Sequence, residues 1–295
     1  MLKKTLIGTV LVATTFGVNQ LFASQLKEEN AKQTIQNAQS EAVQELRTKE
    51  LTKIIKDAAT VLQETQTAYL LLQQGKTENA LTLLQKVQKE LQVLVNKYGL
   101  INLPADVSFI EFNGISDLKK AEQLNKEVKS FVAKNDFVDA RLILALLRNE
   151  IDITTTYIPL KLYKEAIDLT VNLLQSGNKD AALLALQSAL GTLIVETVIV
   201  PKPILEAQYL IEKAEAIYQV NSKAAVSFLE RAEYDVKLTK ALGYISSEKD
   251  IASLVEKIES LMKAIKEHAA TTAEQFKEVK KAVEKAKEEA TTKNK

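Results

Sequence analysis

The chain has 295 residues, with no cysteine, no tryptophan, one histidine, eight glycines and four prolines. The lack of cysteine excludes disulfides, thiolate metal sites, iron–sulfur clusters and thiol nucleophiles, and a single histidine excludes metal sites built from histidine pairs. With 39 basic and 38 acidic residues the chain is almost neutral and lacks the field that favours nucleic-acid binding, while its 46% hydrophobic content is typical of a folded protein.

The N-terminus has the pattern of a secretory signal peptide over residues 1–23. Two lysines precede an apolar run, Leu6–Val18, and small residues follow at Ala23 and Ser24. The alternative is an uncleaved anchor, but polar residues interrupt the run before it reaches the ~20 apolar residues that span a bilayer. We therefore expect cleavage after Ala23 or Ser24, a periplasmic or secreted bacterial protein, and no stable membrane insertion of the mature chain.

Residues 24–49 predict a polar helical arm, because they are rich in Gln, Asn, Glu and Lys and contain few large apolar side chains. A helical domain is expected over 50–265. Its first helix has apolar residues at the i, i+3, i+4, i+7 spacing of one helix face and ends at Gly75. A second helix over 77–97 completes a helical hairpin.

Two segments are β-prone, Val107–Phe112 and Ile151–Ile158, since β-branched and aromatic residues alternate with polar ones in both. They predict either a small two-stranded element or extended loops over the helices, and we favour the paired strands. The fold class is therefore mainly all-α: an irregular bundle of antiparallel helical hairpins with, at most, one small two-stranded β element.

Caps and breakers delimit the other helices of the domain. They predict a helix from Ser116 to about Lys134, 137–150, Pro159 to before Gly177, Asn178 or Asp180 to Val200, Pro203–Val220, Asn221–Ser222 to Gly243, and a last core helix opened by the Ser247/Asp250 capping box and running through Ile265. Residues 266–295 predict a Lys/Glu-rich solvated tail that forms a partly frayed helix. A basic membrane-binding helix is the alternative, and the interleaved glutamates argue against it.

A short pattern recurs at the hairpin turns: an apolar pair, a turn residue, then a small and a large apolar residue. It occurs at Leu71–Gly75 with Ala80 and Leu84, Phe131–Asn135 with Ala140 and Leu144, Leu173–Gly177 with Ala182 and Leu186, and Ile217–Val220 with Ala225 and Leu229. This pattern indicates either a regular helical repeat array or an irregular set of hairpins. The β-prone segments and the longer first interval favour the irregular set.

No catalytic machinery is apparent. The only histidine, His268, lies in the polar tail, where it is expected to be solvated, so a serine nucleophile has no histidine base. Ser116 and Lys119 fit a bare Ser-x-x-Lys pattern, but Ser116 is explained as a helix cap. The isolated glycines form no phosphate-binding motif.

Two pairs of acidic residues are candidates for acid–base or calcium chemistry: Glu150 with Asp152, and Glu165 with Asp168. In a chain with 38 acids such pairs are expected by chance, and a solvated helix face is the better explanation. Six tyrosines of the C-terminal half are compatible with a ligand site but are better explained by the edge of a helical core. These are Tyr157, Tyr163, Tyr209, Tyr218, Tyr234 and Tyr244. We therefore predict no catalytic, cofactor-binding or metal-ligating residue and no cofactor.

The chain resembles the YfdX family of exported bacterial stress proteins over about residues 50–262. The resemblance rests on the order of short segments: Thr156–Leu160 with Tyr163 and Ala166–Ile167, Leu173–Gly177 with Ala181–Ala182, Ala189–Thr192, Val200–Ile204 with Ala207, Ala241–Tyr244, the hairpin at Leu71–Leu84, and Ala140–Leu142. It implies a mainly helical protein associated with acid, heat or other envelope stress, with no established enzymatic activity. It also implies a chaperone-like or ligand-binding role and self-association.

Three functional hypotheses follow. The first is a non-enzymatic protein of the periplasm that holds unfolded or envelope proteins, and small apolar ligands, in apolar grooves between hairpins, as a homo-oligomer. The alternative is a TPR-like helical scaffold that recruits one specific envelope partner. The third is an enzyme that uses carboxylates alone, which would need a deep pocket enclosing two acids with displaced pKa values.

Overall fold

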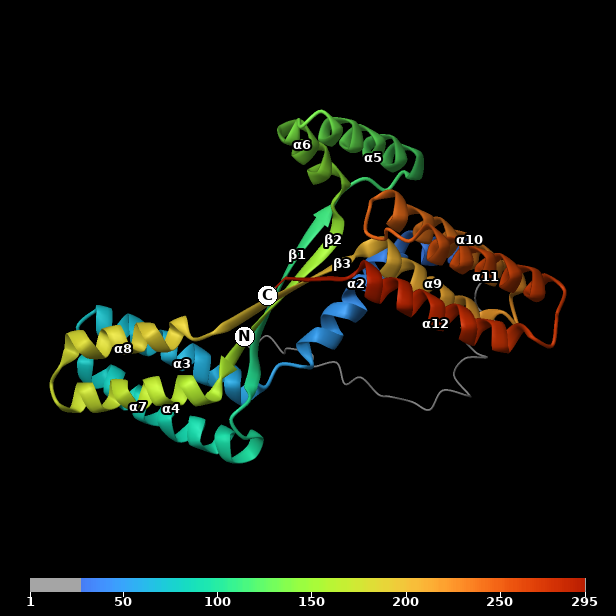
Figure 1. Cartoon of the computed structure of the whole chain (residues 1–295). Coiled ribbons are helices and arrows are strands. Elements are labelled where there is room, and N and C mark those ends of the chain that lie inside the picture. The colour runs from blue at the N-terminus through green and yellow to red at the C-terminus, as the bar shows by residue number, and fades with distance from the viewer. Residues whose placement is uncertain (1–27, 295) are drawn as a thin grey trace, which may run out of the picture. The chain divides into compact units, whose positions relative to one another are not determined.

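The structure is a computed structural model that describes residues 28–294 (Figure 1). The described part of the chain consists of eleven helices and an antiparallel sheet with the strand order β1-β2-β3-β4. The predicted fold class, mainly all-α with helical hairpins and a small β element, is confirmed. The β element has four strands instead of two. The predicted signal peptide, residues 1–23, lies outside the described residues.

The chain repeats one arrangement, a helical hairpin followed by a strand. After α2 (Glu28–Leu51), the elements are α3 (Lys56–Gln73), α4 (Thr77–Tyr98) and β1 (Asn102–Asn113); α5 (Leu118–Ala133), α6 (Phe137–Leu147) and β2 (Asn149–Pro159); α7 (Leu160–Gln175), α8 (Lys179–Gly191) and β3 (Ile194–Pro201); and α9 (Lys202–Ile217), α10 (Ser222–Ala241), α11 (Glu248–Lys266), α12 (Thr272–Ala290) and β4 (Thr292–Asn294). The β-prone segments that we took as evidence against a regular repeat are themselves part of it.

The chain forms two compact units. The sheet unit comprises residues 43–114, 148–201 and 291–294, and the helical unit comprises residues 28–42, 115–147 and 202–290. Because neighbouring strands are antiparallel, the chain direction reverses at each strand, so the first and third hairpins pack together, as do the second and fourth. The boundaries expected at 49/50 and 265/266 do not coincide with this division.

In the sheet unit, α3, α4, α7 and α8 form a four-helix bundle whose core is apolar (Figure 1). Leu84 of α4, Ile167 of α7 and Leu186 of α8 are completely buried there. The amide of Ile55 donates to the carbonyl of Pro104 over 2.9 Å, which ties the start of β1 to α3. The apolar periodicity of each helix therefore produces the hairpins. The core that the two hairpins share also includes residues of β1 and β2 and so positions these strands.

The expected pairing of the two β-prone segments is confirmed, because β1 and β2 pair antiparallel with Phe109 opposite Ile153. The helix expected to continue from Asn178 to Val200 was wrong in its second half. Helix α8 ends at Gly191, and β3 follows and pairs with β2. The β-branched run Ile194–Val200 explains the difference, since such side chains prefer a pleated, half-buried surface. The helix expected over 137–150 likewise ends at Leu147.

In the helical unit, α10 packs against α9, α11 and α5, and α12 packs against α9 and α11. The tail expected to be solvated and frayed from residue 266 therefore belongs to the folded core. Phe276, Val279 and Val283 of α12 are buried, and burial of each such side chain contributes about 1.5–3 kcal/mol. Three apolar residues at helical spacing suffice because α9 and α11 supply the other half of the interface.

Several predicted helix ends are confirmed by hydrogen bonds. Ser247 accepts from the amide of Asp250 over 3.2 Å, and Asn178 accepts from the amide of Ala181 over 3.3 Å. Ser116 was wrong as the cap of α5, since the adjacent Asp117 accepts from the amide of Lys120 over 2.7 Å. Asp117 places its carboxylate one residue closer to the open amides of the first turn.

The hairpin turns share a left-handed residue after the first helix. Gly75, Asn135 and Gly177 have φ values of 75°, 59° and 79°, and in each case the next amide donates back to a carbonyl five residues earlier. This is the Schellman arrangement, which satisfies helix carbonyls that would otherwise lack donors. Of the described helices, none combines the length and apolar character needed to cross a bilayer.

Candidate functional site

The residues considered for nucleophilic catalysis are dispersed. His268 is exposed, as expected, and occupies the turn between α11 and α12 with a φ of 53°. Ser116 and Lys119 are both exposed on the surface, and the carbonyl of Ser116 accepts from the hydroxyl of Tyr234 over 2.9 Å. Their positions are those of turn and surface residues, which offer a substrate no enclosure.

The pair Glu150 and Asp152 lies on β2, where both carboxylates bind Arg148. The guanidinium is 3.0 Å from Asp152 Oδ2, also bonds Glu150, and lies 3.4 Å from the centre of the Phe112 ring. Burial and the negative charge of Glu150 raise the pKa of Asp152. The expectation of a solvated helix face was wrong for this pair, because the segment is a strand with its carboxylates facing one cation.

The second acidic pair does not converge. Asp168 accepts from the Gln88 amide over 2.7 Å and from Lys164 Nζ over 2.6 Å, whereas Glu165 is exposed on the surface of α7. Among the residues that the structure describes, no three acidic or histidine side chains cluster in a way that could hold a metal ion.

The helical unit contains a buried charge cluster that the sequence did not predict. Arg231 of α10 contacts Glu206 of α9 and Asp235 of α10, each at 3.0 Å. Asp235 is completely buried and Glu206 nearly so, and burial raises the pKa of both carboxyls. Gln39 of α2 adds a hydrogen bond to Glu206 over 3.3 Å. The sequence signal was the Arg231–Asp235 spacing of four residues next to the apolar Ala232 and Val236.

The tyrosines do not form a common site. Tyr163 is fully buried in the sheet unit, and burial raises its pKa to about 12. In the helical unit, Tyr218 packs against Phe276, with ring centres 5.1 Å apart. The Tyr234 hydroxyl accepts from the amide of Leu118 over 2.9 Å while donating to the preceding loop, so it fastens α5 to α10. Tyr218 and Tyr234 are half-buried at the edge of a core, as expected, whereas this expectation was wrong for Tyr163, which lies inside the core.

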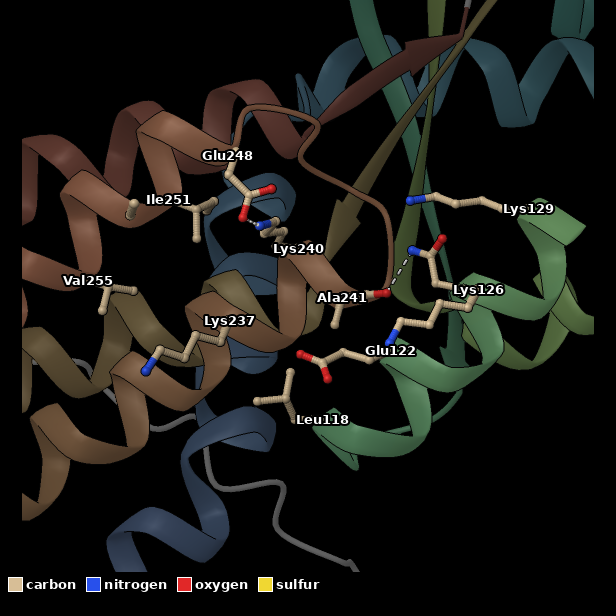
Figure 2. A pocket seen from close by; sticks show the side chains of 12 residues that line it. Leu118, Glu122, Lys126, Lys129, Lys237, Lys240, Ala241, Glu248, Ile251 and Val255 are labelled. Atoms are coloured by element: carbon tan, nitrogen blue, oxygen red, sulfur yellow. Dashed lines mark hydrogen bonds and ion pairs between the residues drawn. The ribbon is translucent and has the colours of Figure 1, made fainter.

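The helical unit also contains a groove between α5, α10 and α11 (Figure 2). It encloses about 550 Å³ and combines apolar side chains with lysines from two helices. Twelve residues line it: Leu118, Glu122, Asn125, Lys126, Lys129, Lys237, Lys240, Ala241, Glu248, Ile251, Ala252 and Val255. It lies between helices of different hairpins, and its lining includes four lysines and two glutamates. Sequence alone could not reveal it, because three separate helices contribute.

An exposed apolar helix, α6, is the second notable surface. Phe137, Val138, Leu142, Leu144 and Leu146 each expose between 47% and 70% of their surface. The residues that take the place of Leu144 in the other repeats, Leu84, Leu186 and Leu229, are completely buried. Helix α6 buries Ala140 and Leu147 and half-buries Ile143, whereas the five residues named above are exposed in the described part of the chain.

Comparison with known proteins finds a protein family that matches the central part of the chain. Residues 61–199 match the family model described as YfdX protein. Among solved structures, YfdX of Salmonella Typhi is similar over 49% of this chain and 90% of that chain, with 16% sequence identity and a TM-score of 0.36. No curated protein sequence matches. The family match spans α3 to β3 and therefore includes α6.

Proposed function

The chain belongs to the YfdX family through residues 61–199, and on that premise we propose that it is a non-enzymatic, chaperone-like protein of the bacterial periplasm. It holds unfolded or envelope proteins during acid, heat or other envelope stress. The apolar surface of α6 is the binding surface in this proposal, and apolar segments of unfolded proteins are its ligands.

The observation that carries the proposal is the exposure of Leu144 beside its buried counterparts. Large apolar side chains that cluster on a surface mark interaction sites, because water contact is costly for them. In the sheet unit, the equivalent residue, Leu84 of α4, is covered because α4 packs on α7 as well as on α3. Within residues 28–294, α6 packs extensively on α5 alone, and its last turn also joins a small cluster with α10 through Leu147. A sequence that leaves five large apolar residues exposed among the eleven of α6 is suited to a partner that is itself apolar.

The test is suppression of aggregation when denatured citrate synthase is diluted, at neutral and mildly acidic pH, with light scattering as the readout. The α6 variant Val138→Glu/Leu142→Glu/Leu146→Glu is compared with a control, Leu162→Glu/Leu169→Glu/Leu184→Glu, whose three leucines on α7 and α8 are similarly exposed, at 52–65%. Wild type and control should suppress aggregation at near-stoichiometric ratio, and the α6 variant should lose most of the effect. Absence of suppression by the wild type, or equal suppression by all three, contradicts the proposal.

Two further measurements separate the alternatives. Crosslinking in the native envelope should recover many clients, whereas a TPR-like scaffold would recover one dominant partner. Light scattering after size exclusion gives the oligomeric state, for which we propose a homo-oligomer. If the α6 variant turns an oligomer into a monomer and client binding is unaffected, α6 is the subunit interface and the assignment to clients is wrong.

The periplasmic location rests on the sequence pattern of residues 1–23, and cell fractionation tests it. The proposal that the chain is not an enzyme rests on the dispersal of its histidine, serine and carboxylate candidates. The buried pair Glu206 and Asp235 has displaced pKa values but is bound by Arg231 inside the core, so it offers no position for a substrate.

A further inference from the structure

The groove between α5, α10 and α11 has two chemically different parts (Figure 2). Leu118, Ala241, Ile251, Ala252 and Val255 provide an apolar part. Ile251 is buried at its base, whereas Ala252 is exposed on the side of α11 that borders the groove. An alkyl chain placed along these residues would remove apolar surface from water on both sides.

The other part carries positive charge. Four lysines line the groove, two from α5 and two from α10, against the two carboxylates of Glu122 and Glu248. Lys240 is paired with Glu248, and Lys237 is paired with Glu233 outside the groove. Lys126 and Lys129 make no ion pair with any described residue, so they are available to a ligand.

The position of these two ammonium groups is favourable for binding an anion inside the groove. Figure 2 shows Lys126 and Lys129 extending from α5 toward the side formed by α10 and α11. The hydrogen bond and charge of Lys240 lower the pKa of Glu248, and the charge of Lys129 adds to this effect, so Lys129 is within electrostatic reach of the start of α11. The site therefore has excess positive charge facing its opening from one helix and apolar side chains on the opposite helix.

We propose that this groove binds a single-chain anionic amphiphile, a carboxylate on an alkyl chain, with the head group between Lys126 and Lys129 and the chain along Ile251, Ala252 and Val255. The volume of about 550 Å³ lies within the range of small-molecule sites, about 300–1,000 Å³. An anion without an alkyl chain would leave the apolar residues of the groove in contact with water. A cationic amphiphile would be repelled by the lysines. The proposal is independent of the client-binding surface on α6.

Binding of dodecanoate, below its micelle concentration, to the mature chain is measured by isothermal titration calorimetry. Dodecyltrimethylammonium tests the chain without the negative head, and inorganic phosphate tests the anion without the chain. Vesicles containing phosphatidylglycerol, in a sedimentation assay, test binding of anionic lipid in a bilayer. We expect saturable 1:1 binding of dodecanoate and none of the cation or of phosphate.

Three variants locate the site. Lys126→Ala/Lys129→Ala should weaken dodecanoate binding at least tenfold, and Ala252→Phe should weaken it by filling the apolar part without changing charge. Lys89→Ala/Lys161→Ala removes two exposed lysines of the sheet unit and should bind like the wild type. Circular dichroism melting verifies that each variant is folded. Equal binding by all variants, equal affinity for phosphate, or binding to vesicles without binding to monomeric dodecanoate overturns the proposal.

Discussion

Replacement of Arg231 by glutamine probes the buried cluster of the helical unit. Arg231 is the cation shared by Glu206 and Asp235, and Asp235 has no access to solvent. Removing one partner of a buried ion pair leaves uncompensated charge in the core, which costs about 3–5 kcal/mol. We expect Arg231→Gln to lower the free energy of unfolding by about this amount at pH 7.

The pH dependence follows from the direction of the pKa shifts. Burial raises the pKa of Glu206 and Asp235 above their ordinary values of 4.5 and 3.8, so the folded state binds protons more tightly than the unfolded state. Stability from these two groups therefore increases as the pH falls from neutral toward those ordinary values, and it decreases as the pH rises through the raised pKa values. The penalty of Arg231→Gln should accordingly be smaller at pH 5 than at pH 7.

Urea unfolding followed by circular dichroism at pH 7 and pH 5 measures these effects, since the chain has no tryptophan. Asp235→Asn is the matched control, because it leaves Arg231 and Glu206 as a one-to-one pair and should not destabilise the protein at pH 7. It should also remove part of the increase in stability between pH 7 and pH 5. A cost of Arg231→Gln below about 1 kcal/mol, or the same pH profile in wild type and Asp235→Asn, refutes the reasoning.

Three other substitutions test individual contacts. Tyr234→Phe removes the hydroxyl that bonds both the first amide of α5 and the loop before it, so it should cost about 1–3 kcal/mol and increase hydrogen exchange in α5. Gly177→Ala should cost about 1–2 kcal/mol because φ is 79° there, whereas Gly191→Ala has open space around the added methyl group and no left-handed φ and should be tolerated in thermal melts. Phe276→Ala should lower the free energy of unfolding by about 3–5 kcal/mol in urea unfolding, because α12 is part of the core. A change near zero would instead support a solvated tail.

The hairpins were predictable from sequence because their determinants are local. Gly75 and Gly177 end their helices, and the polar residues that follow each glycine allow the chain to reverse direction. Ala80 and Ala182 mark the positions where the two helices of each hairpin come into contact. Strand β3 was not predicted because Ile194–Val200 follows α8 directly, and a short β-branched run after a helix fits a helical continuation equally well until its partner β2 is known.

The parts of the molecule that bear on function depend on tertiary packing. Glu206 and Asp235 are ordinary acids in the sequence, and only the crossing of α9 and α10 buries them around Arg231. Helix α12 has too few apolar residues to predict burial by itself, and its burial becomes apparent only when α9 and α11 are in place. Charged residues that are paired in a core cannot be distinguished from solvated ones by spacing alone.

Comparison of α6 with the equivalent helices of the other hairpins explains why its apolar residues are exposed. If α6 were exposed because its sequence is irregular, its small contact residue would also differ from those of the other hairpins. Instead Ala140 is buried in its hairpin, as Ala80 and Ala182 are in theirs, while Leu144, one turn later, is open to solvent. The hairpin is therefore built like the others, but within residues 28–294 no element covers its second face, and an apolar partner would supply that cover.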